Sequence, residues 1–226
     1  MMSSSALDTL KSVPCFASLS PTAGEWLLNC VMEQTFVKGE VIILEGGPYL
    51  GVFIVKSGSV KLYRISSEGE EQILRIINRR GCFECAPLFD KGPNPMSAQA
   101  LESTKVYLIP ASEFRLVLNT QPQALLAILS ILATRLRSLL NMVEDFSFRR
   151  VPSRLAKLLL QLSERHDGVL VVSPRLPLNQ QHLACMLGCT RQAVNSSLRK
   201  LVSDNVIRMK GHRIVVLKPD ALKRIL

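Results

Sequence analysis

The stretch LGCTRQAVNSSLRKL, residues 187–201, separates its polar and apolar side chains as a surface helix does. At about 100° per residue, Val194, Leu198 and Leu201 fall on one stripe of such a helix. The other side carries the polar residues Arg191, Gln192, Asn195, Ser196 and Arg199. One face is therefore predicted to pack on a core, while the other is left to meet a partner.

A second short helix is predicted just before this one. The run QQHLACML begins after Asn179, which can cap a helix N-terminus, and it ends at Gly188. Thr190 is the corresponding cap of the following helix. Two short helices around a Gly-Cys-Thr turn, the second more polar, are typical of a helix-turn-helix, whose second helix enters the DNA major groove. The runs NVIRM and HRIVVL around a turn at 210–211 add a basic β-hairpin, or wing. An ordinary packed helix pair is the alternative.

The net charge of +10 is concentrated in the last third of the chain. Residues 149–226 hold 15 Lys and Arg against 4 Asp and Glu, a balance of +11, whereas residues 1–148 hold 13 against 14, a balance of −1. A basic C-terminal domain beside a nearly neutral N-terminal one indicates a polyanionic partner for the former and a separate task for the latter. A merely solvated basic surface is the alternative.

Short β-rich runs fill the sequence between Thr35 and Ile109. The runs EVIIL, GVFIV, SVKLYRI, EQILRII and KVYLI alternate with turn signals that contain glycine. Strands that recur at intervals of about 8 to 12 residues indicate an antiparallel barrel or sandwich. A β-rich N-terminal domain is therefore predicted over residues 1–120.

After Pro122 the hydrophobic period becomes helical. Apolar residues recur in steps of four and three over three heptads, which is the pattern of a parallel helix pair between two subunits. It predicts a dimerisation helix over residues 121–148, with packing of that helix on its own β-domain as the alternative. We call these residues the heptad seam: Leu125, Leu129, Leu132, Leu136, Leu139, Val143 and Phe146.

The last predicted domain, residues 149–226, begins with a helix break at Pro152. An amphipathic helix is expected to follow and to end near His166, before the strand VLVVS. No uninterrupted apolar run reaches the roughly 18 residues of a membrane span, and the N-terminus lacks a signal-peptide pattern. Six unevenly spaced cysteines predict reduced thiols. These features predict a cytoplasmic protein without a membrane partner, and no nucleophile, acid and base constellation points to an enzyme.

This order of parts resembles the Crp/Fnr family of bacterial transcription regulators over nearly the whole chain. The closest stretches are LNQQHLACMLGCTRQAVNSSLRKLVSDNVIRMKGHRIVV and VFIVKSGSVKLYRISSEGEEQIL. The resemblance implies an α+β fold with an N-terminal antiparallel β-roll, a long dimerisation helix and a C-terminal winged helix-turn-helix. It also implies a homodimer on pseudo-palindromic double-stranded DNA, with RNA polymerase as a further partner.

The DNA contacts that follow from the motif and the resemblance lie on the two short helices and the wing. They are Gln180, Thr190, Arg191, Gln192, Asn195, Ser196, Arg199, Lys200 and Lys210, with Arg208 and Arg213 near the DNA backbone. Many family members have Glu in place of Gln192 and Arg in place of Ser196. Because Gln pairs best with adenine whereas Glu accepts from cytosine, the half-site is expected to differ from theirs.

The resemblance also indicates which residues of the N-terminal domain would bind a cyclic nucleotide as the signal. Cyclic-nucleotide-binding members carry a Gly-Glu pair for the ribose and Arg-Ser/Thr-Ala for the phosphate. The corresponding segment GCFECAPLFDKGPNPMSAQA keeps Ser97 and has Glu84 or Cys85 near the ribose position, but no Arg lies between Arg80 and Arg115. A phosphate there would lose a charge-assisted hydrogen bond worth about 1.5 to 3 kcal/mol. The sequence therefore disfavours cyclic AMP.

Cysteines supply the remaining candidates for the signal. Cys82 and Cys85, with Cys15 and Cys30 upstream, are four thiols that could hold zinc or an iron–sulfur cluster, and two buried thiols are the alternative. All three histidines lie in the basic domain, so a haem in the β-domain would need a thiolate such as Cys85, a Met or the N-terminus. The effector candidates are Cys82, Glu84, Cys85 and Ser97. The effector stays unassigned, and a thiol-based redox or metal sensor using Cys82 and Cys85 is the alternative function.

Overall fold

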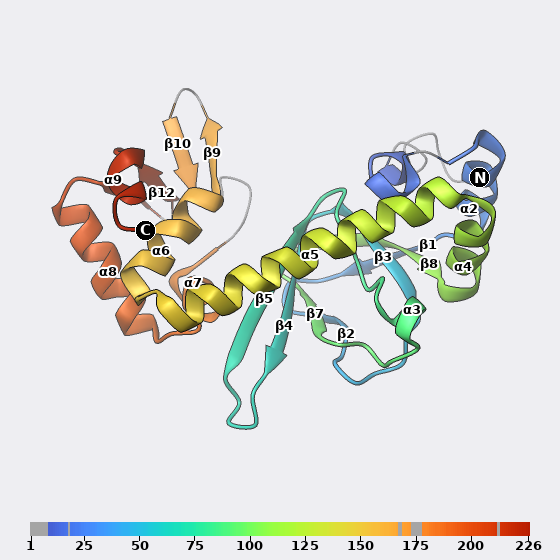
Figure 1. Ribbon diagram of the computed structural model, residues 1–226, viewed down its shortest axis with the longest axis horizontal. Coiled ribbons are helices and arrows are strands. Elements are labelled where there is room, and N and C mark those ends of the chain that lie inside the picture. The colour runs from blue at the N-terminus through green and yellow to red at the C-terminus, as the bar shows by residue number, and fades with distance from the viewer. Residues whose placement is uncertain (1–8, 18, 167–168, 173–177, 212) are drawn as a thin grey trace. The chain divides into compact units, whose positions relative to one another are not determined.

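The computed structural model describes residues 9–17, 19–166, 169–172, 178–211 and 213–226 (Figure 1). The chain packs as two compact units. The first comprises residues up to 64 together with residues 74–138, and the second comprises residues 65–73 and 139–226. Helix α5 continues from the first unit into the second.

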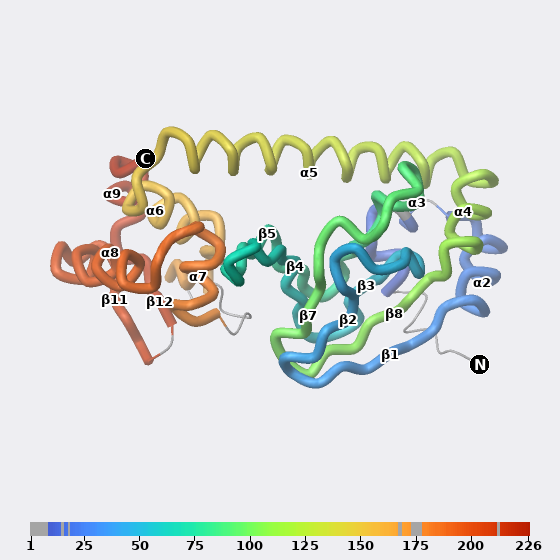
Figure 2. The backbone as a smooth tube through the Cα atoms, turned by 90° about the horizontal axis from the view of Figure 1, so that it is seen from below, coloured from blue at the N-terminus to red at the C-terminus, as the bar shows by residue number. Residues whose placement is uncertain are grey.

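The first unit is an antiparallel β-roll, as predicted. Its two four-stranded sheets have the orders β1-β8-β3-β6 and β2-β7-β4-β5. Figure 2 traces β1 alongside β8, from which it is separated by most of the roll in sequence. The strands are β1 (Met32–Phe36), β2 (Val41–Ile43), β3 (Gly51–Ser57), β4 (Ser59–Ile65), β5 (Glu71–Asn78), β6 (Cys82–Phe83), β7 (Ser97–Ala100) and β8 (Thr104–Pro110). The five predicted runs correspond to β2, β3, β4, β5 and β8.

Helices cover one end of the roll. They are the 3-10 helix η1 (Pro14–Phe16) and the α-helices α2 (Pro21–Cys30), α3 (Pro87–Asp90), α4 (Ala111–Thr120) and α5 (Pro122–Phe148). Leu27 of α2, Phe114 of α4 and Ile128 of α5 are fully buried in one core cluster with Val52 and Ile109 of the sheet. The first turns of α5 are therefore fixed to the roll by apolar burial.

A second core cluster lies between the strands themselves. Phe53 and Phe83 stack with their ring centroids 5.1 Å apart, beside the buried side chains of Val60 and Leu62. These residues alternate along their strands with others that face away, as expected of a pleated sheet with a buried face.

Helix α5 is mostly uncovered beyond its first turns. Ala124 and Ile128 are its buried residues, and most of its later apolar side chains are exposed. By length and composition alone the helix would suffice to span a membrane, but core helices of water-soluble proteins pass the same test. Arg135 and Arg137 interrupt its apolar sequence, so the helix contains no uninterrupted apolar run long enough for a membrane span.

The second unit contains the helix-turn-helix. Its elements are α6 (Val151–Gln161), β9 (Ser163–His166), β10 (Val169–Val172), α7 (Gln180–Leu187), α8 (Arg191–Ser203), β11 (Ile207–Lys210), β12 (Arg213–Val216) and α9 (Pro219–Lys223). Its sheet has the order β11-β12-β10-β9. Leu155 and Leu159 of α6 pack with Leu183 of α7 and Val194 of α8 in one core.

One boundary in this unit was predicted wrongly. The break at Pro152 is confirmed, because α5 ends at Phe148 and α6 begins at Val151. The helix that follows ends at Gln161 and not near His166, and residues 163–166 form a strand. The Ser163 hydroxyl donates to the Leu159 carbonyl at the helix end, and pairing with β10 satisfies the backbone beyond it.

Candidate functional sites

The helix-turn-helix is held in place by caps at each helix end. The Asn179 side chain accepts from the His182 backbone N–H at 2.8 Å, and the Asn179 N–H donates to His182 Nδ1 at 3.3 Å. Gly188 ends α7 in the left-handed region at φ +56°, where other residues are strained. The Thr190 hydroxyl accepts from the Ala193 N–H at 3.2 Å and starts α8. The caps predicted at Asn179, Gly188 and Thr190 are confirmed.

Helix α8 has the two faces expected from its sequence. Val194, Leu198 and Leu201 are buried in the core of the second unit. The opposite face exposes Arg191, Gln192, Ser196, Arg199 and Lys200, whereas Asn195 and Gln180 of α7 are half-buried. In the part of the chain that the structure describes, no ion pair involves the three cations of this face. Their charge is therefore available to an external anion.

The wing follows α8 directly. Strands β11 and β12 pair antiparallel from Ile207 opposite Val216 to Lys210 opposite Arg213, and Gly211 adopts φ +61° in the turn. Arg208, Lys210 and Arg213 are exposed. The predicted basic hairpin is confirmed, and it extends the positive surface beyond the helix.

Polar contacts fix the end of α5 to α6 within the second unit. Both carboxylate oxygens of Asp145 accept from Lys157 Nζ, at 2.6 and 2.8 Å. The Arg154 guanidinium lies over the Phe146 ring, 5.1 Å from its centroid. Phe146, the last residue of the heptad seam, is thus partly engaged in this contact.

Two of the four cysteines proposed as a cluster lie together in the roll. Cys82 and Cys85 are buried and hydrogen-bonded to each other, and this bond with burial raises the pKa of Cys85 well above its ordinary value. The Cys30 thiol instead donates to Glu113 Oε2 at 3.6 Å, and the side chain of Cys15 lies outside the described residues. Among the residues that the structure does describe, no three His, Cys, Asp or Glu side chains are grouped as metal ligands would be.

Glu84, between the two cysteines, is an unusual buried acid. Its backbone is left-handed at φ +60°, and its Oε2 has no hydrogen-bond partner among the described residues. Burial raises the pKa of Glu84 to about 7, although the positive charge of Arg135 acts in the opposite direction. The hydroxyl of Ser97, the remaining effector candidate, accepts from the Glu45 backbone N–H at 2.9 Å.

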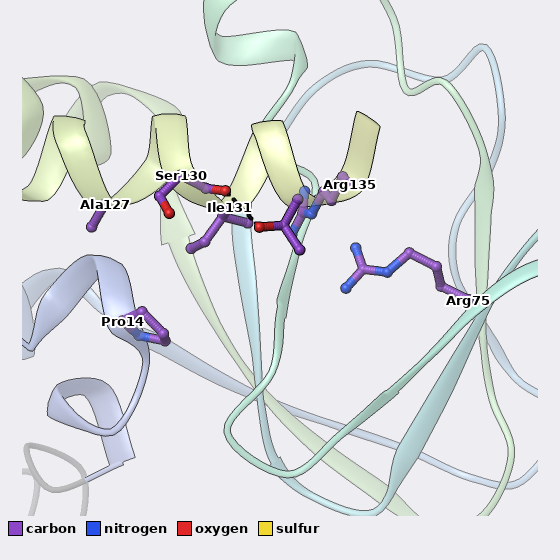
Figure 3. A pocket seen from close by; sticks show the side chains of 7 residues that line it. Pro14, Arg75, Ala127, Ser130, Ile131 and Arg135 are labelled. Atoms are coloured by element: carbon purple, nitrogen blue, oxygen red, sulfur yellow. Dashed lines mark hydrogen bonds between the residues drawn. The ribbon is translucent and has the colours of Figure 1, made fainter. Parts of the chain in front are cut away.

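A pocket that the sequence did not reveal lies between β5 and α5 in the first unit. It has a volume of about 330 Å³, and its lining includes Arg75, Arg135, Ser130 and Pro14. Figure 3 shows the Arg75 guanidinium directed from its strand toward α5, with Pro14 on the opposite side. The signal that could have indicated this site is the charge at Arg75, which interrupts the apolar run EQILRII.

Comparison with known proteins agrees with this architecture. The model of the cyclic nucleotide-binding domain matches residues 33–121, and that of the Crp-like helix-turn-helix domain matches residues 153–225. A CRP-like cAMP-activated global transcriptional regulator of Mycobacterium tuberculosis is 30% identical over 221 residues, which cover 96% of this chain and 98% of that protein.

Solved structures show the same fold. FixK2 from Bradyrhizobium japonicum covers 86% of this chain and 96% of its own, with a TM-score of 0.77 and 22% identity. A CooA variant from Carboxydothermus hydrogenoformans covers 88% of this chain and 89% of its own, with a TM-score of 0.76 and 25% identity.

The roll, the long helix and the winged helix-turn-helix define the class of the protein: it is a DNA-binding transcription regulator. Its curated relatives are regulators of this kind and not enzymes. The chain belongs to the Crp/Fnr family.

Replacement of Glu84 by Gln should stabilise the protein, increasingly so as the pH rises. Because the folded state raises the pKa of this carboxyl to about 7, it favours the protonated form, and charging the group costs stability above the unfolded-state pKa. We expect the gain in free energy of unfolding to grow from under about 1 kcal/mol at about pH 5 to about 2 to 3 kcal/mol at about pH 8. Urea unfolding at both pH values measures it.

The matched control is Glu68→Gln, at an exposed acid in the β4–β5 turn. Its effect on unfolding should be small and the same at both pH values. A gain at position 84 that does not grow with pH would contradict the account of a buried carboxyl.

Proposed function

We propose that this chain is a homodimeric, sequence-specific regulator whose affinity for DNA is set by a signal received in the β-roll. The observation that carries the proposal is helix α8, whose buried stripe of Val194, Leu198 and Leu201 turns an exposed polar face outward. The uncompensated cations of that face and of the wing favour a polyanion, and phosphate contacts of this kind supply most of the non-specific affinity for DNA. The proposal includes RNA polymerase as a further partner and the cytoplasm as its compartment, because a relative over nearly the whole chain is named a global transcriptional regulator.

In this proposal the residues of α8 divide the task of recognition. Arg191 and Gln192, in the first turn, point at base edges, and Asn195 and Ser196 follow one turn later. Arg199 and Lys200 on α8, together with Lys210 on the wing, meet the phosphates and fix the register of the protein on the duplex.

Gln192→Ala and Lys210→Ala should have different effects on DNA binding. Loss of the Gln192 amide should relax base choice at one half-site position at a cost of about 1 to 3 kcal/mol. Loss of the Lys210 charge should weaken binding to all sequences alike and flatten the dependence of affinity on salt. Selection from a random duplex library, followed by titration at several salt concentrations, measures both.

Equal effects of the two substitutions on specificity would show that α8 does not read bases. If the parent protein preferred no duplex over random DNA, the proposal of a sequence-specific regulator would fail.

The homodimer is proposed from the heptad seam. Leu125 and Leu132 pack partly on the core of the roll, but Leu136 and Val143 leave 60% and 62% of their surface exposed. A helix with this much uncovered apolar surface at a/d spacing is suited to pair with a second copy of itself.

Leu136→Glu should dissociate the dimer. A charge in the centre of an apolar helix pair would be desolvated without a partner, so we expect a mass near the 25.1 kDa of one chain in place of twice that value. Asn141→Glu, exposed on the same helix but outside the seam, is the control and should leave the dimer intact. Light scattering coupled to size-exclusion chromatography measures the mass. If the Leu136→Glu variant remained a dimer, the heptad seam would not be the dimer interface.

We propose further that the signal is not cyclic AMP. The M. tuberculosis relative is described as cAMP-activated. Here Met96 precedes Ser97, no Arg lies between Arg80 and Arg115, and the Ser97 hydroxyl already accepts a backbone hydrogen bond. A cyclic phosphate at Ser97 would therefore lack the arginine that the phosphate segment of cyclic-nucleotide-binding members supplies.

Cyclic AMP should therefore leave the affinity for the selected DNA site unchanged. Titration of the DNA complex with and without the nucleotide measures this. An increase in affinity of about tenfold or more, the usual size of allosteric coupling, would contradict the expectation.

A second candidate function, a thiol-based redox or metal sensor, is favoured by one observation. Cys82 and Cys85 are in direct contact, as a dithiol that forms a disulfide must be. Burial and the raised pKa of Cys85 weigh against it, because the reactive and metal-binding form of cysteine is the thiolate.

A further inference from the structure

The pocket between β5 and α5 contains two arginines from different elements of the roll unit. Arg75 comes from β5 and Arg135 from α5, and Ser130 and Thr134 of α5 also line the pocket. In Figure 3 both arginines lie on the same side of Ser130. The volume of about 330 Å³ is at the lower end of the range for small-molecule sites. The pocket does not include residues 96–98, where the family resemblance places the phosphate cassette.

No ion pair among the described residues neutralises the positive charge in this pocket. Within the described part of the chain, Arg75 forms no hydrogen bond or ion pair through its side chain. Burial and the nearby charge of Arg135 both lower the pKa of Arg75. Among the described residues, no acidic side chain lines the pocket, and Glu84, the acid whose charge interacts with Arg135, lies outside its lining.

Arg135 is only partly satisfied. Its Nη2 donates to the Cys82 carbonyl at 2.9 Å, but its buried Nε has no partner among the described residues. Partly buried like charges with unused donors are unfavourable unless an anion joins them. A guanidinium pair of this kind matches the oxygen pairs of a carboxylate or a phosphate.

We propose that this pocket binds a small organic dianion, with its charged groups held by Arg75 and Arg135. The Ser130 hydroxyl is a further polar contact, and the apolar surfaces of Pro14, Ala127 and Ile131 receive the carbon skeleton. The inference rests on the proposed function, since it names the chemical class of the signal that the roll receives. It differs from nucleotide recognition by the cassette, because both cations come from β5 and α5.

The test uses the full-length protein with two dianions, glycerol 3-phosphate and succinate, at about pH 8, where the phosphate is doubly charged. Glycerol and succinamide are the neutral counterparts, and sodium chloride matches the ionic strength. Thermal unfolding gives the stabilisation by each compound, and calorimetric titration gives the dissociation constant. At least one dianion should raise the Tm above its neutral counterpart and the salt control.

The variants are Arg75→Gln and, as a control, Arg137→Gln on an exposed position of α5. Arg75→Gln should weaken dianion binding about tenfold to a hundredfold, and Arg137→Gln should bind as the parent does. Without any anion, Arg75→Gln should unfold at the same temperature as the parent or higher, because it removes a repulsion. If Arg75 only stabilised the fold, Arg75→Gln would instead unfold at a lower temperature than the parent. Arg75→Lys, which keeps the charge, should retain part of the binding.

Three results would overturn the proposal: no stabilisation by either dianion beyond the salt control, equal binding by Arg75→Gln, or a lower Tm of that variant without anion. Selection of a DNA site by the parent protein is measured separately. Failure of the pocket would leave that selection intact, whereas failure of the regulator itself would abolish it.

Discussion

The apolar stripe of helix α8 is the constraint on which the recognition surface depends. Val194, Leu198 and Leu201 are buried in one core with residues of α6 and α7, and truncating either leucine to Ala would cost on the order of 2 to 5 kcal/mol. Because 3.6 residues complete a turn, burying this stripe leaves no choice about where Arg191, Gln192 and Ser196 point. The caps at Asn179 and Thr190 fix where each helix starts, so the rotation of the polar face is set by hydrogen bonds as well as by packing.

In the β-roll the unusual feature is the burial of charged side chains. Glu84, Arg75 and Arg135 are partly or largely buried, and none of them has a full set of partners among the described residues. Stability alone would be served better by apolar side chains at such positions. Retained, incompletely satisfied charges are typical of functional sites, which is why the roll and the part of α5 packed on it are the place to look for the signal.

Local sequence patterns predicted a large part of this structure, and the parts that they missed depend on contacts distant in sequence. The five apolar runs, the capped helix pair and the basic wing are each defined within a few residues. Strand β1, by contrast, has the polar sequence MEQTF and is a strand only because β8 pairs with it. Residues 163–166, which were expected to be helical, likewise form strand β9 because β10 pairs with them.

The candidate sites divide in the same way. The polar face of α8 could be predicted because one helix contains all of it, whereas Arg75 and Arg135 lie 60 positions apart and meet only when α5 packs across β5. Cys82 and Cys85, three positions apart in the sequence, are in contact in the structure, but the left-handed backbone of Glu84 between them has no sequence signature. A non-glycine residue in that conformation is uncommon and is held there by its surroundings.

The position of Arg135 suggests how occupancy of the pocket would be converted into a response. A bound dianion would attract both Arg75 and Arg135 and so hold β5 and α5 together. In the unbound protein the two positive charges repel each other instead. Both effects favour the same arrangement of helix and sheet, and a ligand shifts a conformational equilibrium by as much as its affinities for the two states differ. Arg135 lies one residue before Leu136 of the heptad seam, so a change in the attachment of α5 to the roll would act directly on the surface proposed to pair the two subunits.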